Sequence, residues 1–294
     1  MGEISLWSLG GVGLAGGLLG SMLGLGGGVF IVPLLTLLLN LPIHIAIGSS
    51  LVAVIANSIA ASSTHVRTQL PNIRLGMLLL TATTVGAIVG AFIAALLASP
   101  ILTAIFGIAL IGIGCFMIRR RQLTQESTST GKTLVGSSNV SVISGSSLAA
   151  SYYDRNLNQV VTYNVSRVPH GWGINLLVGV ASSLLGVGGG ILNIPVMNLV
   201  MSVPIRAAMA TNSFMVGITA LAGACIYYYH GYVYPLTVAP IMVGAFIGAL
   251  IGAQLVQRAR SRILRQIFAI VLLLLAFLML LRAFDRAFDI GLPI

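Results

Sequence analysis

Two glycine-rich segments carry the clearest chemical signal in this chain. Residues 23 to 35 read LGLGGGVFIVPLL, and residues 185 to 197 read LGVGGGILNIPVM. Three consecutive glycines weaken a helix, at about 1 kcal/mol per residue relative to alanine. A helix that restarts after such a break offers unpaired N–H groups and the positive end of its dipole, and both favour an anion. The residues that we expect to present backbone donors to an anionic substrate are Gly26, Gly27, Gly28, Gly188, Gly189 and Gly190.

Hydroxyl and amide side chains follow each break at matching positions. Ser50 and Asn57 lie seven residues apart, as do Asn212 and Thr219, and this spacing places each pair on one helical face. Such groups donate hydrogen bonds to an oxyanion, but they also hold membrane helices together. The side chains that we assign to substrate binding are Ser49, Ser50, Asn57, Thr211, Asn212 and Thr219.

His44 and Arg206 occupy equivalent positions, each two residues after a proline that both halves share. We assign them the attraction of an anion toward the site. The alternative is that each is an ordinary polar or charged side chain that reaches the membrane surface.

All five acidic residues lie in the chain ends or in a central polar stretch, outside the predicted membrane spans. They are Glu3, Glu126, Asp154, Asp285 and Asp289. Carboxylates within membrane spans are the usual groups for cation coordination and proton relay, so the sequence disfavours a cation carrier. The spans also lack a Ser/His/Asp set, paired acids and metal-ligand spacing. We therefore expect no enzymatic activity, no metal and no cofactor.

The composition is that of an integral membrane protein. Of the 294 residues 57% are apolar and 7% are charged, and the mean hydropathy is +1.04. Apolar runs of roughly 17 to 25 residues recur, which is about the length that crosses a hydrocarbon core of ~30 Å. The formal charge of +10 arises in connecting segments, so it indicates membrane orientation and not nucleic-acid binding.

The chain is internally duplicated. Its halves align without gaps around the glycine breaks at an offset of 162 residues. We predict a first membrane repeat over 1–118, a polar loop over 119–170 with short strands near 160–165, and a second repeat over 171–294. Glycines at 86, 90, 244 and 248 have the small-xxx-small spacing of close helix packing. The ten predicted segments are roughly 6–23, 28–41, 45–66, 75–98 and 101–118, then 171–185, 190–203, 207–229, 236–257 and 263–281.

The distribution of basic residues predicts that the second repeat is inverted. An odd number of crossings per half inverts the second copy. Inversion places 13 of the 15 lysines and arginines on the cytoplasmic side and leaves Arg282 and Arg286 outside, whereas a parallel arrangement gives 10 against 5. Cytoplasmic enrichment of basic residues therefore favours inversion, with both termini outside and the central loop cytoplasmic. The short glycine-rich segments are either bent crossings or re-entrant hairpins, and both keep the count odd.

The duplicated motif resembles the TauE/SafE family of sulfite and sulfonate transporters. The resemblance is carried by the paired GxGGG…P segments, by PIHIAIGSSL at 42–51 and PIRAAMATNS at 204–213, and by GWGINLLVGVASSLLGVGGG at 171–190. It covers nearly the whole chain. It implies transport of a small sulfur-containing oxyanion, such as sulfite, sulfoacetate or another organosulfonate.

The sequence thus predicts an all-α integral membrane protein of two inverted repeats, with about five segments each and broken or re-entrant glycine-rich helices. It would carry its anion across the cell membrane by alternating access. Its partners would be the lipid bilayer and the substrate, with no nucleic acid, and the sequence leaves open whether two copies form a homodimer. The alternatives are a carrier for another anion or a cation, a channel, an intramembrane enzyme and a non-transport assembly protein.

Overall fold

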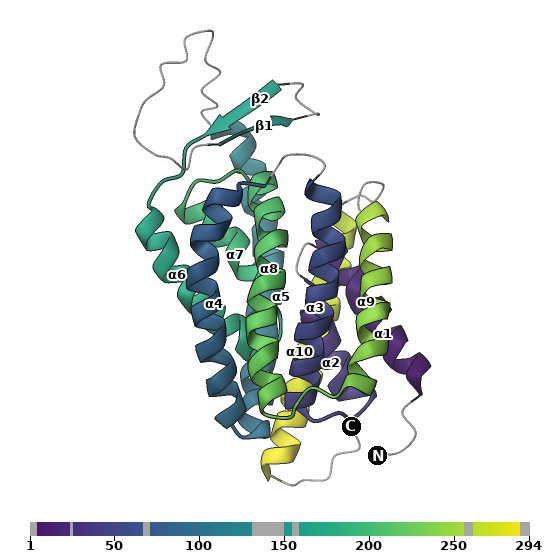
Figure 1. Cartoon of the computed structure of the whole chain (residues 1–294). Coiled ribbons are helices and arrows are strands. Elements are labelled where there is room, and N and C mark those ends of the chain that lie inside the picture. Colours follow the sequence, from purple (N-terminus) through teal and green to yellow (C-terminus); the bar gives the residue numbers. More distant parts are fainter. Residues whose placement is uncertain are drawn as a thin grey trace.

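The computed structural model describes residues 5–23, 26–66, 71–130, 150–154, 159–255 and 261–288 (Figure 1). Within these ranges the chain is helical apart from one antiparallel hairpin, which confirms an all-α membrane fold. The first half contains α1 (Leu6–Leu23), α2 (Gly28–Leu38), α3 (Ile43–Val66), α4 (Ile73–Leu96) and α5 (Ser99–Thr130). The hairpin contains β1 (Ala150–Asp154) and β2 (Gln159–Tyr163). The second half contains α6 (Val168–Leu184), α7 (Gly190–Pro195), the π-helical turn η1 (Val196–Val200), α8 (Ile205–Tyr229), α9 (Pro235–Leu255) and α10 (Ser261–Phe288).

Four helices are long and apolar enough to cross a membrane, judged by length and composition within the described residues. These spans are Ile43–Ser63, Ile73–Leu96, Ala207–Tyr229 and Pro235–Leu255. They fall in α3, α4, α8 and α9, so the third and fourth helices of both halves match the predicted spans.

The glycine-rich segments form short helices. α2 has 11 residues, and α7 with η1 covers residues 190–200. At 1.5 Å per residue each reaches about 16 Å, roughly half of a ~30 Å hydrocarbon core. The helix lengths therefore favour re-entrant segments over full crossings.

The helices of the two halves are interleaved, and the pairing is the same when the halves are exchanged. α1 packs along α9 and α6 packs along α4, so the first helix of each half lies on the fourth helix of the other. Likewise α3 packs on both α8 and α9, and α8 packs on both α3 and α4, while α5 packs on α10. Neither half therefore forms a separate bundle.

The third helices run in opposite directions. Ser58 of α3 donates a hydrogen bond to the Ser213 carbonyl near the start of α8, whereas Leu51, one helical stretch earlier, faces Gly223 toward the end of α8. Figure 1 shows the end of α3 and the start of α8 at the same end of the bundle as the β hairpin, with the α8–α9 connection at the opposite end. Inversion of the second repeat requires this opposed direction.

The spaced glycines are packing residues, as the small-xxx-small pattern predicted. A Cβ atom on Gly86 or Gly90 would overlap the Leu176 or Val180 carbonyl oxygen of α6. A Cβ atom on Gly244 or Gly248 of α9 would likewise overlap carbonyl oxygens of α1. The two cross-repeat helix pairs thus depend on backbone contact.

The polar central stretch is more structured than a loop. α5 does not end with its apolar run at residue 118 but continues to Thr130. The predicted strand near residues 160–165 is present as β2, which pairs with β1 from Ala150↔Tyr163 to Asp154↔Gln159.

Candidate substrate site at the two glycine turns

Both glycine segments form left-handed turns directly before a helix. The φ angles are +82° and +83° at Gly26 and Gly27, and +73° and +83° at Gly188 and Gly189. Residues with a Cβ atom adopt this conformation at a cost of roughly 1–2 kcal/mol, which explains why the turns require glycine. α2 then begins at Gly28 and α7 at Gly190. The predicted breaks are therefore present in both halves.

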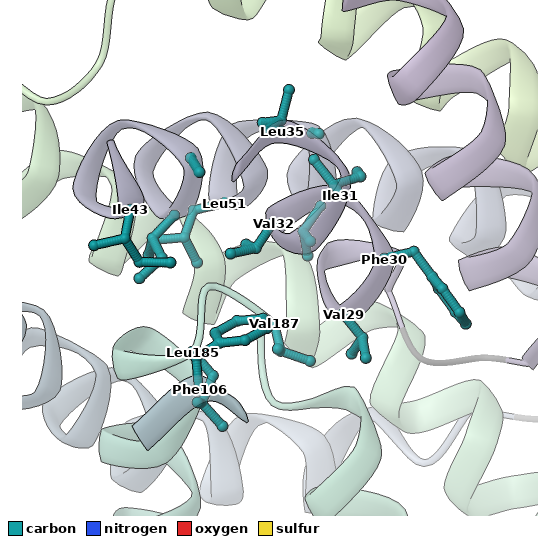
Figure 2. Close-up of a cluster of buried hydrophobic side chains, with 14 of the residues drawn as sticks. Val29, Phe30, Ile31, Val32, Leu35, Ile43, Leu51, Phe106, Leu185 and Val187 are labelled. Carbon is teal, nitrogen blue, oxygen red and sulfur yellow. The ribbon is translucent and has the colours of Figure 1, made fainter. Parts of the chain in front are cut away.

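The two turns touch each other inside the molecule. A Cβ atom on Gly28 would overlap the Gly186 carbonyl oxygen and would lie 2.9 Å from Val187 Cα. A Cβ atom on Gly26 would lie 3.3 Å from the Val187 carbonyl oxygen. Figure 2 shows the segment with Leu185 and Val187 facing the first turn of α2, where Val29 lies. Segments 162 residues apart thus form one structural element.

Two valines at equivalent positions lie against this element. Val54 of α3 and Val216 of α8 each place a Cγ1 atom 3.3–3.4 Å from the Cβ position of Gly26. The Cβ position of Gly188 is also closest to these two methyl groups. Both valines are buried. The turns, α3 and α8 therefore meet at one place, where the two halves face each other.

All six predicted polar side chains are buried, and two of them bind the turns directly. Ser50 Oγ donates to the Gly186 carbonyl at 2.7 Å, across the boundary between the halves. Asn212 Nδ2 donates to the Gly190 carbonyl at 3.3 Å, within the second half. Ser50 of α3 and Asn212 of α8 therefore lie beside the breaks.

Asn57 and Ser49 are buried and keep unpartnered oxygens. Asn57 Nδ2 lies 3.6 Å from the Cβ position of Gly27, and neither Asn57 Oδ1 nor Ser49 Oγ has a hydrogen-bond partner. A buried polar atom without a partner costs about 1–3 kcal/mol. Its presence therefore calls for a physical reason, and a bound solute is one.

Thr211 and Thr219 instead connect helices. The Asn72 backbone N–H donates to Thr211 Oγ1 at 2.9 Å at the start of α4. Thr219 Oγ1 lies 3.1 Å from Thr83 Oγ1 of α4. The alternative recognised from the sequence, that such hydroxyls hold helices together, describes their contacts in this structure.

His44 is buried, and its ring contacts the end of α4 and Tyr232. Its Nε2 is 3.2 Å from the Ala94 carbonyl and 3.1 Å from the Leu97 carbonyl, and its ring stacks on Tyr232 at 4.8 Å. These contacts hold the end of α4 against α3. The His44 ring is therefore buried in this conformation and is not exposed to attract an anion. Arg206 belongs to α8, and its side chain is outside the described part of the structure.

Comparison with known proteins identifies the family. The family model described as "Sulfite exporter TauE/SafE" matches residues 9–279. The chain belongs to the TauE/SafE family. It is 26% identical to the "Probable membrane transporter protein YunE" of Bacillus subtilis over 241 residues, which is 80% of this chain and 82% of that protein. It is 25% identical to the "Probable membrane transporter protein MJ0441" of Methanocaldococcus jannaschii over 244 residues, covering 79% and 77% of the two chains. No solved structure matches the chain.

Membership makes this TauE/SafE protein a multi-pass membrane transporter of a small molecule and not an enzyme. Within the described residues, no group of three or more His, Cys, Asp or Glu side chains is placed to hold a metal ion.

Sequence reasoning missed several polar residues around the second turn of this TauE/SafE transporter. Ser182 of α6 and Asn193 of α7 are buried, with side-chain atoms that have no partner. Ser182 stands in a run of small residues and Asn193 interrupts an apolar run after the glycines. That single amide in an otherwise apolar helix start was the available signal.

Sequence reasoning also missed Arg282. This residue of α10 is buried and donates to the Thr36 carbonyl and, at 2.6 Å, to Asn40 Oδ1. These acceptors lie at the end of α2 and just after it. A cation at a helix C-terminus is stabilised by the helix dipole, so Arg282 fastens the short helix of one half to the last helix of the other.

Proposed function

We propose that this TauE/SafE transporter carries a small sulfur-containing oxyanion, such as sulfite, sulfoacetate or another organosulfonate, by alternating access. The family description supports a sulfur oxyanion. The observation that carries the proposal is the contact between the two glycine turns, where buried polar atoms without partners gather. Among these atoms, the Ser49 and Ser182 hydroxyls and the Asn193 amide nitrogen can donate hydrogen bonds to an anionic oxygen.

The paired architecture supports alternating access. Inverted repeats place the substrate where they meet, near the bilayer midplane, and rocking of one repeat against the other exposes that place to each side in turn. The antiparallel α3 and α8, and the exchangeable helix pairing, are the features that such a mechanism uses. We propose the orientation that the basic residues favour. The β hairpin and the central polar stretch then lie on the cytoplasmic side of the cell membrane, and both termini lie on the outer side.

Replacement of the turn glycines tests the proposal. Gly27→Leu and Gly189→Leu introduce side chains at φ +83° in both turns, so anion uptake into vesicles should fall to background in the double variant. Gly11→Leu and Gly112→Leu form a matched control, because no atom lies within 4 Å of either Cβ position.

The transport assay should compare sulfite, sulfoacetate, sulfate and a carboxylate as solutes. Unchanged anion uptake by a correctly folded double variant would refute the role of the turns. Uptake of a cation when none of these anions is present would refute an anionic substrate.

A further inference from the structure

The two glycine turns differ in the side chains around them, although their backbones match. Ser182 and Asn193 of the second half correspond to Gly20 and Ile31 of the first at the 162-residue offset. Gly20 packs directly on Gly27, where a Cβ atom would overlap the backbone. Ile31 is fully buried. The first turn thus has Asn57 as its neighbouring amide, whereas the second has two further polar side chains, Ser182 and Asn193, where the first has Gly20 and Ile31.

The polar groups at the second turn converge from three helices. Asn193 Nδ2 of α7 lies 3.2 Å and Ser182 Oγ of α6 lies 3.4 Å from the Cβ position of Gly189. Asn212 of α8 binds the neighbouring Gly190 carbonyl. A Cβ atom on Gly189 would therefore crowd both side chains, so these polar atoms lie directly beside the turn.

These side chains are at least 98% buried, yet most of their hydrogen-bonding capacity is unused. Ser182 Oγ, Asn212 Oδ1 and both Asn193 polar atoms have no partner in the structure. Asn212 uses its amide nitrogen on the Gly190 carbonyl, which leaves its oxygen as an acceptor. Polar atoms in this state destabilise the fold unless a ligand pairs with them.

We propose that the second turn holds the polar part of the substrate, through Ser182, Asn193 and Asn212, and that the substrate is a monoanion carrying its own hydrogen-bond donor. This rests on the proposed function and narrows its substrate class. The Ser182 hydroxyl and the Asn193 amide nitrogen donate to the anionic oxygens. The two carboxamide oxygens only accept, so they require an O–H or N–H group on the ligand. The neutral side chains favour a single negative charge over two.

A pair of matched sulfonates tests the donor requirement. 2-Hydroxyethanesulfonate and propane-1-sulfonate have similar length and the same charge but differ in a terminal O–H against a methyl group. We expect purified wild-type protein to bind the hydroxyl compound about tenfold or more tightly, because the methyl group leaves buried acceptors unpaired. Isothermal titration in detergent measures both dissociation constants.

The double variant Ser182→Gly/Asn193→Ile gives the second turn the residues of the first. It should weaken binding of the hydroxyl compound about tenfold or more and remove the difference between the two sulfonates. Its melting temperature without ligand should stay level or rise, because it removes unpaired buried polar atoms. Ser213→Ala is the control, since this hydroxyl bonds its own helix at Met209, and it should bind both compounds as wild type does.

The outcomes separate the two proposals. If wild type binds neither sulfonate nor sulfite, the proposed function fails. If wild type binds the two sulfonates equally, or the double variant keeps the preference, the function stands and this inference is overturned. If the double variant melts at a lower temperature, Asn193→Asp decides, because it preserves shape and adds a negative charge. Loss of binding in Asn193→Asp supports the inference, and retained binding overturns it.

Discussion

At the scale of single residues, the buried polar groups fall into two kinds. Some complete helix contacts: Thr211 accepts from the start of α4, and Thr219 meets Thr83. Others remain unpaired beside the turns, as Asn57 and Asn193 do. The same chemical type in one protein therefore serves both architecture and, in our proposal, substrate binding, and only the partners distinguish the roles.

Arg282 is expected to stabilise α2, because it donates to two oxygens at the end of that helix. Arg282→Leu should lower the free energy of unfolding by about 1.5–3 kcal/mol, the usual loss for hydrogen bonds from a charged group. The free energy of unfolding of Arg282→Lys should lie between those of wild type and Arg282→Leu. Lysine keeps the charge but lacks the planar guanidinium that reaches both acceptors. Thermal or denaturant unfolding in detergent measures the series. An Arg282→Leu protein as stable as wild type would show that these bonds contribute nothing.

The breaks in the helices could be predicted from the sequence, because three consecutive glycines inside an apolar run strongly disfavour a continuous helix. Ser50, Asn57 and Asn212 lie beside the turns, and the spacing of seven residues, which reports a helical face, pointed to them. The contacts of Thr211 with Asn72 and of His44 with Tyr232 could not be predicted. Such contacts join segments far apart in the chain, and local periodicity carries no information on them. Asn193 was missed because an isolated amide in an apolar run has no pattern of its own.

At the scale of elements, the cross-repeat helix pairs depend on glycine. α1 lies so close to α9, and α6 to α4, that glycine positions face carbonyl oxygens of the neighbouring helix. This closeness also leaves little room for independent movement within a pair. In our proposal each pair moves as one body during transport, and the short helices α2 and α7 move with the turns that precede them.

Alanine at these contacts should separate the paired helices. Gly244→Ala and Gly248→Ala each place a methyl group on backbone atoms of α1, and overpacking of this kind costs about 1–3 kcal/mol. Gly112→Ala and Gly173→Ala are matched helical controls with open space around the Cβ position, and they should be neutral or stabilising by up to about 1 kcal/mol. Unfolding of all four variants under one condition compares them. Equal stabilities across the set would rule out the importance of backbone contact.

At the scale of the whole molecule, a nearly symmetric pairing of helices surrounds a chemically asymmetric centre. The same helices pack together when the two halves are exchanged. Alternating access requires such a pairing, because the conformations open to the two sides of the membrane must have similar energies. The side chains at the turns do not obey this symmetry, because Ser182 and Asn193 correspond to Gly20 and Ile31. In our proposal the paired helices of both halves permit the rocking movement, and side chains of the second half bind the polar part of the substrate.

The most direct test asks whether the centre opens to both sides. Val54 lies against both turns and is fully buried in this conformation, so a cysteine there reacts only when the centre opens. Val54→Cys, in a Cys115→Ala/Cys225→Ala background, is treated with a membrane-impermeant thiol reagent in right-side-out and inside-out vesicles. We predict modification from both sides, slowed in both cases by saturating 2-hydroxyethanesulfonate. Modification from one side only, or rates that 2-hydroxyethanesulfonate leaves unchanged, would contradict a central substrate site with alternating access.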